Sequence, residues 1–593
     1  MGAAVGDQRA RRRAAVAAAT ALLAAWWCCC AAAQVVKPTP RQAYGAAYGH
    51  MACQASVLIE PNSTEQLAAA LKSHLAAAAA AGKSVKVRAT HKFFHSTTAF
   101  ACPSNTTNIF TPEAGSRPAF GAGPDLSVGV LLGGMDRVLS TDPAIHTMRV
   151  QAGMTVRQLL EAATAAGMSV PLGTVPAFAD LMLGGVLLTG AHGSNYKGKS
   201  NLGDILKEIT WVDATGTTRT SARDSPEGRA LAGGLGLLGI VSELTLQLAP
   251  PSNTRFETVW QSGDEDIASD ILELVARSPR ALVVWRPDMH KYTAVLLSEV
   301  PASEPTTGAT QTIELPKLVA SGFGTMVRTW EEMARPPYVL EEAMCIASKE
   351  VSISHGWASN LRGRPLKNGV GPTNEMQSVS CGDQCAWEAE IANLAMWDTH
   401  FTTELWKLPD WIADVKKLMA EDFTGRCLPP GYFWLRFGDG NGDLLSPASG
   451  LNGTVNLQLS FMTSKASAPQ WGIKHGHILE TLEQLTLCKY KGRPHWGKNH
   501  ERTYTHPNCS VPELYPRFGE FLAMRSKLDP ARVFEPPLFA QMLARAPPRY
   551  GPRCALSGEC FCREDKHCGP GRACVPSAAF PEYRACRRVG ATG

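Results

Sequence analysis

The chain has 593 residues, of which 45% are hydrophobic and 19% are charged, so it can bury the cores of several domains. Its net charge of +5 is small for this length, and no basic stretch is interleaved with aromatic residues. The composition therefore argues against a nucleic-acid partner.

The N-terminus has the pattern of a secretory signal peptide. Four arginines within residues 9–13 precede an apolar run that ends in AAA at residues 31–33. We expect cleavage after Ala33, which makes residues 1–33 the signal peptide; the alternative is an uncleaved signal anchor, because the run is about 20 residues long. We expect no transmembrane segment after cleavage, and a location in the secretory pathway, either extracellular, in the cell wall, or vacuolar.

Cysteine usage agrees with this route. Of 17 cysteines, three lie in the signal peptide, and the remaining even number favours disulfides over metal ligands in an oxidising compartment. Four N-x-S/T sequences are available for glycans: Asn62, Asn105, Asn452 and Asn508.

From residue 56 to about residue 250 the sequence predicts an α+β region. SVLIE at 56–60 and SVKVRA at 84–89 have the composition of strands, and the helix between them begins with Ser63 and Gln66 at capping-box spacing. RATHKFFHSTTAFAC at 88–102 follows the second strand; there His95 is either a surface histidine or a cofactor anchor, and Cys102 is open to a disulfide.

Two glycine-rich segments follow. LGGVLLTGAHGS at 183–194 offers exposed amides and small hydroxyls that suit an anion such as a diphosphate, although a plain glycine-rich turn is the alternative. GLGLLG at 234–239 matches the dinucleotide-binding expression, but a helical sequence precedes it and the strand-like IVSELTLQL follows. A Rossmann site needs this motif after a strand and at the start of a helix, so the order here argues against a Rossmann NAD site.

Two motifs in the second half carry candidate chemistry. YFWLRFGD at 432–439 places Arg436 in a strand of aromatic residues, where a buried guanidinium needs either a structural ion-pair partner or a ligand. PHWGKNH at 494–500 places His495 and Lys498 three residues apart, so a helix-like turn would put both on one face.

The C-terminal segment, residues 546–593, has many cysteines and little apolar material between them. Such a segment cannot make its own core, so we expect three internal disulfides; a structural zinc site is the alternative. The six cysteines are Cys554, Cys560, Cys562, Cys568, Cys574 and Cys586.

Together these segments resemble the vanillyl-alcohol-oxidase-type flavoproteins and, within them, the aldonolactone oxidoreductases of the plant L-gulono-1,4-lactone oxidase-like group. The resemblance rests on His95-Ser96, LGGVLLTGAHGS, LGLLGIVSELTL, PHWGKNH and the six-cysteine tail, in that order. It implies an α+β, two-domain FAD-binding (PCMH-type) fold with a cap substrate domain and a Cys-rich tail. The implied boundaries are 34–252 for the FAD-binding domain, 253–545 for the cap domain, with about 486–545 returning to the flavin, and 546–593 for the tail.

The resemblance implies FAD as the cofactor and no metal. In this family the histidine of the His-Ser pair is commonly bonded to the flavin 8α-methyl group, and that position is His95. Residues 184–194 would cradle the diphosphate, and residues 236–241 would lie near the adenosine. The implied cofactor-binding residues are His95, Ser96, Gly133, Gly184, Gly185, Thr189, Gly190, His192, Gly193, Ser194, Gly236, Gly239, Ile240 and Val241.

The implied activity is the oxidation of L-gulono-1,4-lactone to L-ascorbate, with molecular oxygen reduced to hydrogen peroxide. A secondary alcohol loses a proton from O–H and a hydride to flavin N5, and a fixed cation near N1 and C2=O stabilises the charge that develops. Lys498 is the candidate for that cation. His495 is the candidate for accepting or relaying the hydroxyl proton, and Arg436 for orienting the lactone oxygens.

The sequence departs from the family pattern at three places. Phe93 and Phe94 stand where many relatives have glycines, and Trp434 stands where many have a glutamate beside the arginine. Gly133 stands where family dehydrogenases tend to carry an alanine that shields the flavin from oxygen, which favours an oxidase. The alternatives are an oxidase or dehydrogenase of another sugar or aldonolactone, and a secreted non-catalytic binding protein on a flavoprotein scaffold.

Overall fold

A parallel β-α-β unit begins the first region, as the sequence predicts. In the computed structural model two strands pair in parallel with β6, and helix α2 connects them. Ser63 caps this helix by accepting from the amide of Gln66, but the Gln66 side chain accepts from the amide of Asn62 instead of that of Ser63. The predicted capping box is therefore half formed. The elements are β3 (Val57–Ile59), α2 (Thr64–Ala80), β4 (Val85–Thr90) and β6 (Leu126–Leu131).

The structure describes residues 42–45, 51–91, 99–104, 106–108, 124–261, 263–309, 311, 317–333, 336–350, 357–359, 364–379, 393–422, 427–467 and 471–589. The predicted signal peptide, the Asn105 sequence and the segment with Phe93, Phe94, His95 and Ser96 lie outside the described residues. All of the described residues belong to one unit of the chain, Pro40–Gly593.

An antiparallel five-stranded sheet, in the order β10-β9-β11-β8-β7, completes the first region. Its strands are β7 (Val138–Asp142), β8 (Thr147–Gln151), β9 (Leu206–Val212), β10 (Thr218–Ala222) and β11 (Ile240–Gln247). Three helices accompany it, namely α3 (Val156–Ala165), α4 (Leu183–Thr189) and α5 (Pro226–Leu231). Helix α5 precedes residues 234–239 and β11 follows them, so the order that argued against a Rossmann site is confirmed. A small antiparallel sheet of β1 (Gln42–Gly45), β2 (Met51–Ala55) and β5 (Thr106–Asn108) lies in the same region.

The second region is built on an eight-stranded sheet in the order β15-β12-β14-β13-β17-β18-β16-β19, in which all the neighbours pair antiparallel. Its strands are β12 (Ser252–Gln261), β13 (Arg280–Arg286), β14 (Lys291–Pro301), β15 (Asn368–Pro372), β16 (Leu394–Glu404), β17 (Gly431–Gly438), β18 (Thr454–Ser464) and β19 (Arg493–Pro494).

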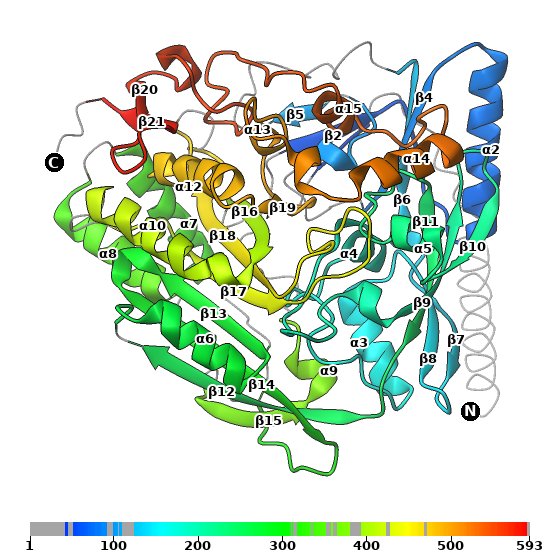
Figure 1. Cartoon of the computed structure of the whole chain (residues 1–593), viewed down its shortest axis with the longest axis horizontal. Coiled ribbons are helices and arrows are strands. Elements are labelled where there is room, and N and C mark those ends of the chain that lie inside the picture. Colours follow the sequence, from blue (N-terminus) through cyan, green and yellow to red (C-terminus); the bar gives the residue numbers. More distant parts are fainter. Residues whose placement is uncertain are drawn as a thin grey trace, which may run out of the picture. The chain divides into compact units, whose positions relative to one another are not determined.

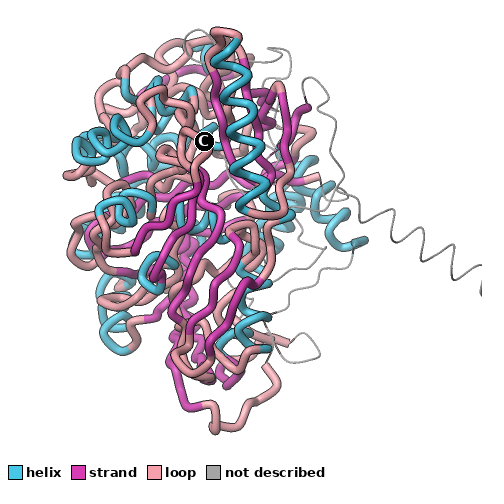
Figure 2. Tube along the Cα trace, turned by 90° about the vertical axis from the view of Figure 1, so that its right-hand side faces the viewer, coloured by secondary structure: helices cyan, strands magenta, loops and turns pink. Residues whose placement is uncertain are grey.

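Three helices cover one face of this sheet (Figure 1): α6 (Ile267–Arg277), α10 (Leu408–Asp422) and α12 (Gly476–Cys488). Their apolar residues form one buried cluster with Phe433, Leu435 and Phe437 of β17. Because side chains alternate along a strand, the even-numbered residues of β17 lie on the opposite face. The remaining helices of this region are α7 (Lys317–Glu332), α8 (Tyr338–Lys349) and α9 (Thr373–Met376). Figure 2 shows helices and strands interspersed throughout the described chain.

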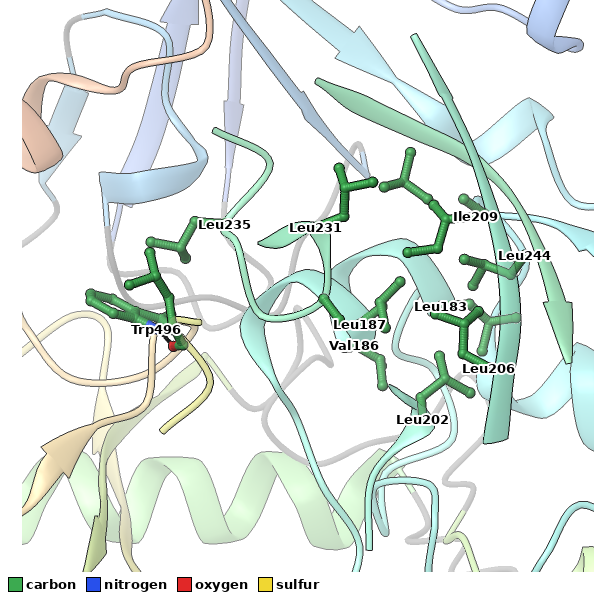
Figure 3. Packing of buried hydrophobic residues seen from close by; sticks show 14 of the residues in the cluster. Leu183, Val186, Leu187, Leu202, Leu206, Ile209, Leu231, Leu235, Leu244 and Trp496 are labelled. Carbon is green, nitrogen blue, oxygen red and sulfur yellow. Dashed lines mark hydrogen bonds between the residues drawn. The ribbon is translucent and has the colours of Figure 1, made fainter. Parts of the chain in front are cut away.

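The chain after β19 packs back against the first region. Trp496 belongs to the same buried cluster as Leu183, Leu235 and Leu244, and Figure 3 shows it beside Leu235. The indole Nε1 of Trp496 donates to the carbonyl of Leu445 at 2.7 Å. Short helices follow, namely α13 (Glu501–Tyr504), α14 (Phe518–Leu528) and α15 (Pro537–Leu543).

The Cys-rich unit, residues 550–589, holds the hairpin of β20 (Arg572–Pro576) and β21 (Arg584–Arg588). Its six cysteines form three internal disulfides, as predicted: Cys554–Cys560, Cys562–Cys574 and Cys568–Cys586. Three more join Cys53–Cys102, Cys345–Cys427 and Cys488–Cys509. Of the helices that the structure describes, none has the length and hydropathy of a membrane span.

Candidate active site

Polar side chains gather on the face of the eight-stranded sheet opposite to α6, α10 and α12. The register pairs Trp434 of β17 with Gln458 of β18, and Gln458 with His400 of β16. Arg436 is two residues after Trp434 on β17, and Asp398 is two residues before His400 on β16. Both therefore lie on the same face as these residues. This polar face brings together the arginine that the sequence singled out and three residues that it did not.

Arg436 is buried and binds only neutral groups. Its guanidinium donates to the carbonyl of His192 at 3.0 Å and to Oε1 of Gln458 at 2.6 Å, and it lies 4.6 Å from the ring centroid of Trp434. Among the described residues no carboxylate forms an ion pair with it, and its buried Nε has no hydrogen-bond partner. Burial lowers the pKa of Arg436 to about 10, and nearby Asp398 opposes that effect. The ion pair that the sequence left open for Arg436 is therefore not formed with any of the described residues.

Lys498 is held by Asp398. The ammonium Nζ lies 2.9 Å from Oδ2 of Asp398, and Oδ1 of the same carboxylate accepts from Ser460 at 2.7 Å and from Gln458 at 3.2 Å. Burial lowers the pKa of Lys498, and the negative charge of Asp398 partly restores it. Because Gln458 also binds Arg436, one hydrogen-bonded chain connects the two cations.

Three imidazoles meet beside this chain. Nε2 of His192 lies 3.2 Å from Nε2 of His400, and the ring centroid of His495 lies 5.0 Å from that of His400. Nδ1 of His192 lies 2.9 Å from the carbonyl of Gly193, which can only accept, so Nδ1 carries the proton. Burial lowers the pKa of all three rings well below the usual value, so they are neutral.

The tautomer of His495 changes its expected role. The amide of Gly497 donates to Nδ1 of His495 at 3.1 Å, so the proton of the neutral ring sits on Nε2. A ring in this state donates from Nε2 and accepts no proton there. The sequence predicted that His495 accepts or relays a proton. The structure presents a neutral ring that donates from Nε2, because the amide of Gly497, in the turn that brings Lys498 back towards His495, is directed at Nδ1.

The glycine-rich segment 183–194 is partly helical, and the sequence analysis expected no helix there. Helix α4 spans its first half, and Gly190 ends it with a φ of 65°. The hydroxyl of Thr189 donates to the carbonyl of Gly185, and that of Ser194 donates to the carbonyl of Ala281. Ser194 is buried instead of exposed, since β17 covers it, and its hydroxyl accepts from the amide of Phe437. Any diphosphate contact here would therefore come from backbone amides.

The remaining predicted cofactor residues differ in their surroundings. Gly133 is exposed, and a Cβ there would lie 3.2 Å from Nε2 of His91. Gly236 has a φ of 63°, and its carbonyl accepts from Arg88 at 3.1 Å. A Cβ on Gly239 would lie 2.5 Å from the ring of Trp211, so this glycine allows a close approach within the core. Two more predicted residues have core side chains, namely Ile240 and Val241.

Comparisons with known proteins show what the chain resembles. A model of the FAD binding domain matches residues 96–222, one of D-arabinono-1,4-lactone oxidase matches residues 470–542, and one of the L-gulonolactone oxidase 2-like C-terminal domain matches residues 551–588. L-gulonolactone oxidase 2 of Arabidopsis thaliana is 27% identical over 93% of this chain and 92% of its own length. L-gulonolactone oxidase of Bos taurus is 23% identical over 68% of this chain and 82% of its own.

The chain is an FAD-binding flavoprotein that resembles the L-gulonolactone oxidases over most of its length. Among solved structures, a solvent-stable cholesterol oxidase superposes with a TM-score of 0.62 at 16% identity, over 85% of this chain and 97% of that one. The predicted fold, an α+β FAD-binding (PCMH-type) fold with a Cys-rich C-terminus, is confirmed.

The residues of this flavoprotein fit FAD at two places. A Cβ on Gly185, near the start of α4, would meet no atom of the described residues within 4 Å, so among these residues the glycine borders open space. On the polar face, the described chain offers no hydrogen-bond partner to three buried nitrogens: Nε of Arg436, Nε1 of Trp434 and Nδ1 of His400. Buried polar atoms without partners are rare in folded proteins, so groups from a bound molecule would satisfy them.

Proposed function

We propose that this protein is an FAD-dependent oxidase that converts L-gulono-1,4-lactone to L-ascorbate and reduces oxygen to hydrogen peroxide. The single observation that carries the proposal is the chain from Lys498 through Asp398 and Gln458 to Arg436, which fixes two cations on one buried face. Bound FAD would accept the hydride and pass the electron pair to oxygen. The names of the relatives and the matched lactone oxidase model support a lactone as the substrate.

Each residue of the face has a role that its geometry allows. Lys498 keeps two ammonium protons beyond its bond to Asp398, and these can stabilise negative charge that develops nearby. Arg436 can orient lactone oxygens through its Nε–H, which has no partner among the residues that the structure describes. His495 can hold a substrate oxygen through Nε2–H. A fixed arrangement of donors costs no reorganisation during the reaction.

Trp434 favours a second candidate, the oxidation of another sugar lactone. The indole lies on the polar face, edge-on to Tyr432 with ring centroids 5.8 Å apart. A substrate hydroxyl finds an aromatic ring at this position and not a carboxylate. The preference among lactones can therefore differ from that of relatives with a glutamate at this position.

A panel of aldonolactones tests both candidates. We expect hydrogen peroxide to form in proportion to lactone consumed, most rapidly with L-gulono-1,4-lactone. A higher kcat/KM for another lactone would support the second candidate. Reduction of an added dye without peroxide would instead identify a dehydrogenase. In the same preparation, acid precipitation tests the proposed bond to His95: free flavin in the supernatant would contradict it.

We propose that the protein passes through the secretory pathway. Six disulfides among the described residues support an oxidising compartment. N-terminal sequencing of the product from a secreting host should begin at Gln34, and a retained leader would contradict the predicted cleavage.

A further inference from the structure

We propose that the Cys-rich unit, through its 554–560 loop, positions the active-site segment 495–502, and that it is not a separate binding module. The inference rests on the proposed role of Lys498. The part of the unit that acts is the 554–560 loop, which the disulfide Cys554–Cys560 closes.

The 554–560 loop holds Arg502 through two of its carbonyls. NH1 of Arg502 donates to the carbonyl of Ala555 at 3.2 Å, and the amide of Arg502 donates to the carbonyl of Gly558 at 3.0 Å. The guanidinium is fully buried, and its Nε donates to Glu483 of α12 at 2.7 Å. A buried charge must keep its partners, so the loop and α13 cannot separate without large cost.

The β20–β21 hairpin of the Cys-rich unit also contacts α12. The amide of Cys586 donates to Oε2 of Glu480 at 3.1 Å, and Nε2 of Gln484 donates to the carbonyl of Arg584 at 3.0 Å. Figure 1 shows β20 and β21 next to α12. The hairpin and Arg502, four residues after Lys498, thus hold the same face of α12, where Oε1 of Glu480 lies 3.8 Å from NH1 of Arg502.

Contacts from Gly558 through His500 to Trp397 connect the 554–560 loop to the ion pair of Asp398 and Lys498. Gly558 has a φ of +75°, and a Cβ there would lie 2.7 Å from three atoms of the His500 side chain. The His500 ring stacks on Trp397 with centroids 3.9 Å apart and an interplanar angle of 27°. Trp397 precedes Asp398, which binds Lys498, and the amide of Asn499 donates to the carbonyl of Asp398 at 3.0 Å. Displacing His500 would therefore disturb Asp398 through Trp397 and Lys498 through the turn that both residues share.

Gly558→Ala tests this inference, with Gly571→Ala as the matched control. Both glycines belong to the Cys-rich unit and have similar φ angles, +75° and +67°, so alanine brings similar backbone strain to both. A Cβ at Gly571 would meet nothing within 4 Å, whereas one at Gly558 would push His500. The measurements are FAD content, the midpoint potential of the bound flavin and the rate constant of its reduction by L-gulono-1,4-lactone.

We expect Gly558→Ala to keep its FAD, to lower the midpoint potential, and to slow reduction by about tenfold to a hundredfold, the effect of a misplacement of about 1 Å. Gly571→Ala should match the wild type in both measurements. Equal values for the two variants would overturn the inference. If the wild type does not react with the lactone, the proposed function fails, but the midpoint potentials still decide the inference.

A second pair of variants serves if Gly558→Ala does not fold. Cys554→Ala/Cys560→Ala opens the 554–560 loop without adding atoms, and Cys562→Ala/Cys574→Ala removes another disulfide of the same unit. The first should lower the midpoint potential more than the second. Equal midpoint potentials would overturn the inference.

Discussion

At the scale of single residues, the charge of Lys498 depends on Asp398. Burial lowers the pKa of Lys498, and the carboxylate 2.9 Å away raises it again. Arg436 adds to the lowering, since a like charge disfavours the ammonium. Without Asp398 only the two lowering effects would remain.

We predict that Asp398→Asn shifts the alkaline limb of the pH profile for flavin reduction to lower pH. A charged Lys498 acts below its pKa, and its contribution is lost as pH rises through that pKa, which falls in the variant. Stopped-flow reduction from pH 6 to pH 10 measures the limb. Asp443→Asn is the control, because it breaks another buried ion pair, with Arg223 at 2.7 Å. An unchanged limb in Asp398→Asn, or the same shift in the control, would contradict the role of Asp398.

The sequence singled out Lys498 and Arg436 but not Asp398. Both cations stand in recognisable motifs, whereas Asp398 stands in MWDTHFTTE, an ordinary buried strand. The available signal was the polar set Asp398, His400 and Thr402 at every second position. Their partners depend on the register between β16 and β18, which connects residues about 60 positions apart and cannot be derived from local pattern.

At the scale of elements, α4 shows why local pattern failed in the glycine-rich segment. Two glycines disfavour a helix by about 1 kcal/mol each. The helix forms because Leu183, Val186 and Leu187 are buried in the core and the amide of Gly184 donates to the carbonyl of Ala152 at 2.8 Å. Strands rich in β-branched and aromatic residues, such as β17, were predicted correctly because that signal is local.

We predict that Gly185→Ala weakens FAD binding without destabilising the protein. Its Cβ would meet no atom of the described residues within 4 Å, and alanine favours a helix, so the Tm of the FAD-free protein should stay the same or rise. FAD content after purification should fall, because the methyl group fills the space we assign to the cofactor. Gly193→Ala is the contrast: its Cβ would lie 2.2 Å from the carbonyl oxygen of Gly173, so it should lower the Tm directly. Full FAD content in Gly185→Ala would exclude that assignment.

At the scale of the whole molecule, buried acids connect stability to pH. Glu331 of α7 accepts from the amide of Ser464 and from Ser467, while its Oε1 has no partner among the described residues. Burial raises the pKa of Glu331 to about 7. Between its usual value of 4.5 and about 7 the folded protein keeps a proton that the unfolded chain releases, so the free energy of unfolding falls as pH rises through this window.

We predict that Glu331→Gln reduces the fall in the free energy of unfolding with rising pH. The wild type should lose about 3 kcal/mol from this group between pH 5 and pH 8, and the uncharged glutamine should lose none of it. Thermal unfolding at both pH values measures the difference. Glu332→Gln, the next residue and half of an exposed pair with Arg328, should keep the wild-type slope. A steep slope in Glu331→Gln would mean that another group carries the effect.

The overall architecture was predicted better than its internal contacts. The disulfides of the Cys-rich unit followed from an even cysteine count in a segment without a core. Its contact with Arg502 did not, because a buried arginine between two distant segments leaves no local pattern. The role of His495 also needed coordinates, since one amide decides its tautomer.

Anaerobic mixing of the FAD-loaded protein with L-gulono-1,4-lactone tests the central proposal most directly. We predict that the lactone reduces the flavin of the wild type, and that Lys498→Met slows this reduction by about 10²–10³-fold, the usual cost of losing one group that stabilises developing charge. Air should then restore the oxidised spectrum with one hydrogen peroxide per flavin. A flavin that dithionite reduces fully but the lactone leaves oxidised would contradict the proposed activity.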